Sequence, residues 1–138
     1  MLIQLPEKPF ETPLETLKWI QEVFQEKTHF LRETFWGKAL PEEIEQSSIL
    51  EYFRKEGIEG FCLLGGIILG SGWGKDLKVG EELYSETHSI LRVVAKMEFP
   101  SALSIIEIND KLGRSAVLHL LKKTISYIEE TNHANPTA

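Results

Sequence analysis

The side chains best suited to chemistry near neutral pH are four histidines and one cysteine, and their spacing indicates no metal site. The histidines, His29, His88, His119 and His133, lack the H-E-x-x-H spacing of zinc sites, and a single cysteine cannot supply a C-x-x-C pair. We therefore expect neither a metal nor a cofactor. Cys62 lies inside an apolar run, which is typical of a core thiol and not of a nucleophile. No serine has the G-x-S-x-G setting of a nucleophile elbow.

One pair of residues has types and a spacing that suit phosphoryl transfer. Arg114 and His119 begin and end the segment RSAVLH, which fits the pattern R-x4-H. This segment resembles the signature of HEPN-type ribonucleases, which are small all-α bundles that act as dimers. The resemblance implies metal-independent RNA cleavage, in which Arg114 stabilises phosphate charge and His119 moves protons at the RNA 2′-hydroxyl. The alternative interpretation places His119 on the solvent face of a helix with Lys122 and Lys123, without a catalytic role.

The composition is that of an ordinary globular domain. The 138 residues are enough for one domain with its own core, and 42% of them are hydrophobic and 26% charged. The net charge is −6, with 21 acidic residues against 15 basic ones, which argues against general binding to nucleic acid or anionic membranes. The single cysteine, and the lack of a basic segment followed by an apolar one at the start, favour a cytoplasmic protein.

The chain is organised around a glycine-rich stretch from residue 57 to residue 80, which holds eight of its ten glycines. Residues 60–74 carry no charged side chain, but these 15 residues are fewer than the ~20 that a membrane span needs. The glycines also fail the P-loop pattern, because Asp76 stands where phosphate binding requires serine or threonine. We therefore expect a buried, closely packed element that ends in a glycine turn.

Two structures of this buried element fit its residues. A helix that begins near Ile58 would be interrupted by four glycines, each costing about 1 kcal/mol relative to alanine, and burial of its apolar side chains at ~1.5–3 kcal/mol each would offset that cost. A strand over residues 61–69 would need partner strands that the chain barely provides, so the helix is preferred. In that helix, Gly65, Gly66 and Gly70 are expected to let a second helix approach closely.

The rest of the chain has apolar residues at helical spacing. Thr12 and Glu15 form a capping box around Pro13, which predicts a helix from residue 12 to about Phe35 that stops at Gly37. Proline and glycine then separate the following segments from one another. The other predicted helices cover residues 41–56, 81–98, 102–112 and 115–130, and the first of these is either kinked or divided in two.

Two similar short segments of the sequence indicate a repeated unit. The residues WGKAL at 36–40 return as WGKDL at 73–77, and each copy is followed by acidic residues and then by Ser-Ile-Leu. Spacings of this size are typical of paired-helix repeats, and a chance match is the alternative. A true repeat predicts that Trp36 and Trp73 each pack at a helix end. It also predicts three helical hairpins, which would cover residues 12–56, 58–98 and 100–131.

Together these patterns predict an all-α protein, a compact bundle of five to six helices with a buried glycine-rich central helix. One domain would cover residues 1–131, with a disordered tail at 132–138. We expect a non-enzymatic protein–protein interaction module, such as an adaptor, a regulator or an assembly subunit, that binds a protein partner and also itself as a homodimer. The alternatives are a HEPN-like ribonuclease using Arg114 and His119, and a bundle that holds a small apolar ligand.

Overall fold

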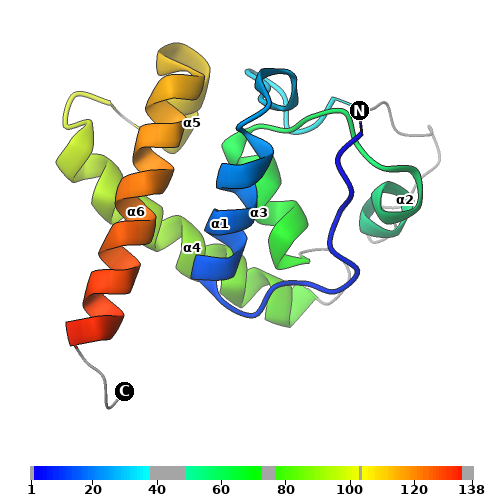
Figure 1. Cartoon of the computed structure of the whole chain (residues 1–138), viewed down its shortest axis with the longest axis horizontal. Helices are drawn as coiled ribbons and strands as arrows, with labels where there is room; N and C mark the ends of the chain where they lie inside the picture. Colours follow the sequence, from blue (N-terminus) through cyan, green and yellow to red (C-terminus); the bar gives the residue numbers. More distant parts are fainter. Residues whose placement is uncertain (1, 38–48, 73–76, 103, 135–138) are drawn as a thin grey trace.

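The computed structural model describes residues 2–37, 49–72, 77–102 and 104–134, and its regular elements are all helical (Figure 1). Strand-like pairing in this part of the chain is limited to three isolated bridges. The predicted all-α bundle is therefore confirmed. In chain order the elements are α1 (Pro13–Val23), η1 (Lys27–His29), α2 (Ile49–Glu56), α3 (Leu63–Ser71), α4 (Leu77–Glu98), α5 (Ile105–Glu107), the π-helical turn η3 (Ile108–Leu112) and α6 (Arg114–Ala134).

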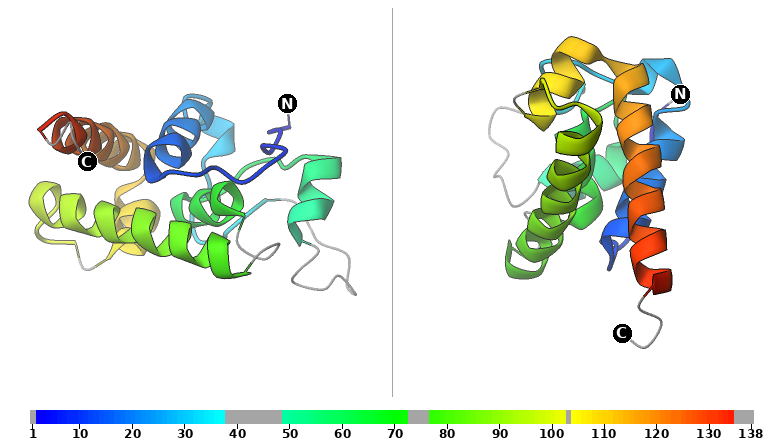
Figure 2. Two further views of the ribbon diagram at one scale, coloured as in Figure 1. Left: turned by 90° about the horizontal axis from the view of Figure 1, so that it is seen from below. Right: turned by 90° about the vertical axis from the view of Figure 1, so that its left-hand side faces the viewer.

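Four helices form the packed centre of the bundle. The two longest, α4 and α6, pack on each other, and α1 packs against α6, α3 and α4 (Figures 1 and 2). The shorter α3 contacts both α1 and α4, while α2 stands to one side, next to the N-terminal arm (Figure 1). None of the helices in the described part is both long and apolar enough to cross a bilayer. The largest fully buried side chains of the shared core include Phe24, Phe53, Phe61, Leu17, Ile20, Leu63, Ile67 and Leu91.

Helix α1 begins as its sequence predicts but ends much earlier. The Thr12 hydroxyl accepts a hydrogen bond from the Glu15 amide at 3.2 Å and donates one to the Glu15 carboxylate at 3.0 Å. The predicted continuation to Phe35 is wrong, because α1 ends at Val23. The chain beyond η1 is a loop instead, and its backbone pairs with the residues that lead into α3.

Helix α3 is the glycine-rich central helix, and the alternative of a buried strand is wrong. It starts at Leu63 and not near Ile58, because the residues between them are extended. The Cys62 sulfur accepts a hydrogen bond from the Gly65 amide at 3.3 Å, which satisfies one of the free amides at the start of the helix. Gly72 ends the helix with a φ of 75°, a left-handed conformation that glycine adopts without steric cost.

Helix α4 covers its predicted range and begins one turn earlier. The helical spacing of its sequence predicts an inward face formed by Leu83, Thr87, Ile90, Val94 and Met97. Of these, Leu83, Thr87 and Val94 are buried. The predicted face is wrong at Met97, which is 57% exposed, and it omits Leu91, which is fully buried. The buried face of α4 therefore includes Leu91 and not Met97, and the helix packs on α6, α3 and α1.

The segment predicted as a helix at residues 102–112 is divided in two. A single α-helical turn, α5, is followed by η3, in which the Gly113 amide donates to the Ile108 carbonyl at 3.0 Å, five residues back. Gly113 then ends the segment with a φ of 89°. Helix α6 starts at the next residue and continues to Ala134, beyond the predicted domain boundary at residue 131. The remaining residues, 135–138, lie outside the described part.

The three predicted hairpins are only partly present. Helices α3 and α4 pack on each other, and η3 packs on α6, as the second and third hairpins require. The first hairpin is not formed by α1, which packs on α3, α4 and α6 and ends long before α2 begins. Residues 38–48 and 73–76 lie outside the described part of the chain, and with them Trp73 and most of the predicted repeat.

Candidate functional site

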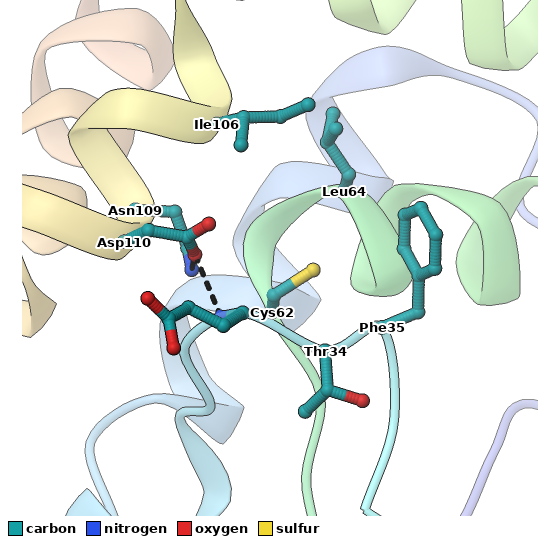
Figure 3. A pocket seen from close by; sticks show the side chains of 8 residues that line it. Thr34, Phe35, Cys62, Leu64, Ile106, Asn109 and Asp110 are labelled. Atoms are coloured by element: carbon teal, nitrogen blue, oxygen red, sulfur yellow. Dashed lines mark hydrogen bonds between the residues drawn. The ribbon is translucent and has the colours of Figure 1, made fainter.

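A pocket of about 180 Å³ lies where three segments meet: the loop after η1, the start of α3, and the α5–η3 turn (Figure 3). Its lining combines an apolar wall with acidic and hydrogen-bonding groups. Unusual backbone, buried polar groups and exposed apolar side chains coincide here, which makes this pocket the candidate site. The lining residues are Glu33, Thr34, Phe35, Cys62, Leu64, Ile106, Asn109 and Asp110.

Backbone pairing holds the loop against the chain that leads into α3. The Leu31 amide donates to the Phe61 carbonyl at 3.0 Å, and the Cys62 amide donates to the Phe35 carbonyl at 3.1 Å. The Phe35 carbonyl also lies over Gly65, where any Cβ atom would collide with its oxygen. Glycine therefore permits the close approach expected at position 65, although the neighbour is a loop and not a second helix.

The buried side chain of Asn109 forms hydrogen bonds that connect the three segments. It comes from η3 and is 3% exposed. Its amide nitrogen donates to the Leu31 carbonyl at 3.0 Å and to the Asp110 carboxylate at 2.8 Å. Its amide oxygen accepts from the Leu63 amide at 2.9 Å, which satisfies a free amide at the start of α3. One side chain thus joins the loop, the helix and the turn.

The loop bends sharply at Glu33, whose φ of 62° is the one positive value at a non-glycine residue in the described chain. A left-handed conformation costs such a residue roughly 1–2 kcal/mol, so its surroundings must hold it in place. Asp110 does so, since its Oδ1 accepts a hydrogen bond from the Glu33 amide at 2.8 Å (Figure 3). The bend brings Thr34 and Phe35 to the pocket.

The π-helical turn η3 presents Asn109 and Asp110, adjacent in the chain, to the same pocket. Such turns are rare, and they occur frequently at functional sites. Here the Asn109 amide donates a hydrogen bond to the loop and the Asp110 carboxylate accepts one from it, and these bonds stabilise both the turn and the bend at Glu33. Two conformations of raised energy therefore meet at one pocket, which is a sign of a functional site.

Cys62 presents its sulfur to the pocket (Figure 3) and is 8% exposed. Burial raises the pKa of its thiol, against hydrogen bonds from the Gly65 and Leu64 amides that lower it, and the Asp110 carboxylate raises it further. A thiol that stays protonated near neutral pH is a poor nucleophile. The geometry therefore agrees with a core thiol.

The wall of the pocket is apolar and partly exposed. Figure 3 shows Ile106, Leu64 and Phe35 gathered along one side. Leu64 is buried, whereas Phe35 is 48% exposed and Ile106 is 53% exposed, so these two form an apolar patch at the mouth. Behind them, Trp36 is partly buried with its ring 5.6 Å from the Phe53 ring of α2. Trp36 thus lies in the loop and packs on α2, whereas the repeat predicts a tryptophan that packs at a helix end.

The two residues of the predicted catalytic pair, Arg114 and His119, each form hydrogen bonds to a different helix end. Arg114 starts α6, and its guanidinium donates to the Phe24 carbonyl at 2.8 Å and to the Gln25 carbonyl at 3.0 Å, which caps the end of α1. His119 shares a hydrogen bond of 2.7 Å with the Glu98 carboxylate at the end of α4. Both side chains therefore have structural roles, and RNA cleavage by them stays a prediction from the resemblance.

Gly66 and Gly70 face α1, one helical turn apart. A Cβ atom at Gly66 would stand 3.0 Å from the Ile20 side chain, and one at Gly70 would stand 3.0 Å from the Thr16 side chain. Both of these α1 residues are fully buried. The two glycines thus form a flat surface on which α1 lies.

A second hollow is wider and more open, with a volume of about 710 Å³. It lies between the N-terminal arm and the α1–η1 region, and both polar and apolar side chains line it. No cluster of histidine, cysteine, aspartate and glutamate in the described residues is arranged to hold a metal ion. The polar lining residues are Gln4, Glu22, Gln25, Glu26 and His29.

Comparison of the sequence with family models and with curated proteins, and of the structure with solved structures, gives no match. The site therefore depends on geometry alone. Sequence reasoning missed Glu33, Asn109 and Asp110, which shape the pocket. One signal was present, because Asn109 and Asp110 interrupt an isoleucine-rich segment just before Gly113. Glu33 offers no signal, since its conformation depends on a hydrogen bond to a distant segment.

Proposed function

We propose that the protein is a non-enzymatic interaction module that binds a protein partner through the pocket beside Cys62. The observation that carries the proposal is a preformed pocket with two exposed apolar side chains, Phe35 and Ile106, at its mouth. Apolar anchors that enter such pockets supply most of the energy of protein interfaces. The hydrogen bonds of Asn109 and Asp110 fix the shape of the pocket before binding, which lowers the entropy cost of association.

The size of the pocket favours one side chain of a partner over a free small ligand. Sites for drug-sized ligands commonly measure roughly 300–1,000 Å³, whereas this pocket measures about 180 Å³. A cavity of about 150 Å³ holds one benzene molecule, so there is room for a group of side-chain size. The apolar patch around the mouth would then contact the rest of the partner's binding segment.

The proposal assigns no chemistry to the site. The Cys62 thiol has a raised pKa, and Asn109 and Asp110 already hold the loop. A module of this kind acts as an adaptor, a regulator or an assembly subunit, in a cytoplasm where its single cysteine stays reduced. Its partners include a second copy of the chain, as in a homodimer.

Comparison of co-purified proteins tests the proposal. The parent protein, Ile106→Glu and Val93→Glu are each purified from the native host, and their bound proteins are quantified by mass spectrometry. Val93 on α4 is 48% exposed and lies outside the pocket lining, so its variant controls for an added surface charge. We expect one protein to be recovered equally with the parent and Val93→Glu, and about tenfold less with Ile106→Glu, as for the loss of an interface anchor.

Equal recovery with all three proteins would show that the pocket is not the binding site. Self-association is measured separately, by sedimentation of the parent protein over a range of concentrations. A protein that stays monomeric at every concentration removes the homodimer from the proposal.

A further inference from the structure

The pocket is acidic as well as apolar. Glu33 and Asp110 are the charged residues in its lining. Among the described residues neither carboxylate forms an ion pair. Arg32 and Lys111 are their neighbours in the chain, but neither of these basic residues lines the pocket. Two carboxylates that form no ion pair with the described residues therefore stand beside an apolar wall.

The two carboxylate oxygens of Asp110 differ in their hydrogen bonds to the described residues. Its Oδ1 accepts the two hydrogen bonds from the Glu33 amide and the Asn109 side chain. Its Oδ2 accepts none from the described part of the chain. Figure 3 shows the carboxylate directed from η3 toward the space between the loop and Cys62. The fold thus holds this acceptor in place and leaves it available.

We propose that the occupant of the pocket is an arginine or lysine side chain presented by a second protein and not by another copy of this chain. This inference rests on the proposed function and adds the chemistry of the partner. The alkyl part of such a side chain suits the wall formed by Phe35, Leu64 and Ile106, while its charged end suits Asp110 and Glu33. The net charge of −6 also attracts a basic partner from a distance and speeds encounter.

Other occupants fit the charges of the pocket less well. An aliphatic or aromatic side chain would cover the two carboxylates without pairing them, and a covered, unpaired charge is unfavourable. An acidic side chain or a phosphate group would be repelled by both carboxylates. A basic side chain satisfies the apolar wall and the acidic groups together.

Fragment binding tests the charge preference without knowledge of the partner. The ¹⁵N-labelled full chain is titrated with n-butylguanidinium, which carries the alkyl arm and charged end of arginine, and with its neutral analogue n-butylurea. We expect n-butylguanidinium to shift the backbone amide signals of Glu33, Phe35 and Cys62 in a saturable manner. The neutral analogue should bind about fivefold more weakly, the effect of one partly exposed ion pair. Equal binding of the two fragments, or no saturable shift with either, overturns the inference.

Two matched variants test whether n-butylguanidinium binds at the pocket. Asp110→Asn keeps the Oδ1 acceptor that holds the loop but removes the charge, and it should weaken n-butylguanidinium binding about fivefold. Glu107→Gln removes a charge from α5, three residues away and outside the pocket lining, and it should change the affinity by less than about twofold. Equal losses in the two variants would reveal a general effect of net charge and contradict the inference.

Photo-cross-linking identifies the source of the bound side chain. Ile106 is replaced by p-benzoylphenylalanine in the full chain, the native host is irradiated, and the joined peptide is sequenced by mass spectrometry. We expect a peptide from a second protein with an arginine or lysine close to the joined position. A peptide from another copy of this chain, or one without a nearby basic residue, overturns the inference.

The two experiments separate this inference from the proposed function. A cross-link to a protein, without any preference for n-butylguanidinium, leaves the interaction module and rejects the basic side chain. Selective binding of n-butylguanidinium, without any protein cross-link, rejects the protein partner and with it the proposed function.

Discussion

The three glycines of α3 provide a graded test of how the central helix is packed. A Cβ atom at Gly65 would collide with a backbone oxygen of the loop. One at Gly66 would stand 2.6 Å from the buried Phe61 ring, and one at Gly70 would stand 3.0 Å from a methyl group of α1. The added methyl group would therefore meet fixed backbone at Gly65 and a buried ring at Gly66. At Gly70 it would meet a side chain that a small shift can move away. We expect the cost of alanine substitution to decrease in the same order.

Two opposing terms set the size of each effect. Alanine is more favourable than glycine inside a helix by about 1 kcal/mol, and this gain is common to the three positions. Overpacking a buried site costs about 1–3 kcal/mol, with the upper end where backbone must move. The net loss of stability is therefore about 2 kcal/mol for Gly65→Ala, about 1 kcal/mol for Gly66→Ala and close to zero for Gly70→Ala.

Thermal unfolding followed by circular dichroism measures the three variants against the parent. In a domain near this size, 1 kcal/mol shifts the Tm by roughly 2–4 °C, so Gly65→Ala should lower it by roughly 4–8 °C. Gly70→Ala should leave the Tm within about 2 °C of the parent and is the matched control, because it adds the same methyl group to the same helix. A Gly65→Ala protein as stable as the Gly70→Ala protein would refute the packing of the loop on α3.

Other substitutions test the remaining contacts. Asn109→Leu leaves two backbone groups unpaired and should lower the free energy of unfolding by about 2–4 kcal/mol. Lys111→Leu on the same turn should lower it by less than about 0.5 kcal/mol. Equal losses would contradict the role of Asn109 in joining the loop to α3. Burial lowers the pKa of His88 in the folded state, so the unfolded chain binds a proton at this histidine at a higher pH than the folded protein does. The free energy of unfolding therefore decreases as the pH falls below about 6.5 toward the folded-state pKa. The Tm of His88→Phe should therefore fall less than that of the parent between about pH 7 and about pH 5, and identical falls would exclude His88 as the cause. We expect no RNA cleavage by the purified protein, a lower Tm for Arg114→Ala because α1 loses its cap, and little change for His119→Ala. Metal-independent cleavage that both variants lose would show that the pair is catalytic.

Helix limits could be predicted from the sequence where their signals are local. The capping box at Thr12 starts α1, and Gly57, Gly72 and Gly113 follow the ends of helical segments with positive φ values of 77°, 75° and 89°. These signals act within a few residues, because a cap satisfies amides of its own helix and glycine relieves a clash with its own backbone. The surrounding fold does not alter them.

The end of α1 could not be predicted, because it depends on a distant residue. The apolar residues Leu31 and Phe35 continue the helical spacing of α1. In the folded chain, however, the Arg114 guanidinium binds the carbonyls of Phe24 and Gln25, and the loop after η1 pairs with the residues before α3. Tertiary contacts thus override a local helical pattern. The same hydrogen bonds give Arg114 a structural role, although its spacing from His119 resembles that of a catalytic pair.

The candidate site could not be predicted because its features are each unfavourable alone. The left-handed Glu33, the π-helical turn and the buried amide of Asn109 would each be replaced by an ordinary alternative in an isolated segment. They are stable together, because the Asp110 carboxylate satisfies the Glu33 amide and Asn109 binds the loop and α3 at once. A regular α-helical turn and a loop without a left-handed residue would serve stability alone at lower energy. Asp110 instead holds, at an apolar pocket, a carboxylate oxygen that accepts no hydrogen bond from the described residues, which supports the proposal that this arrangement serves binding.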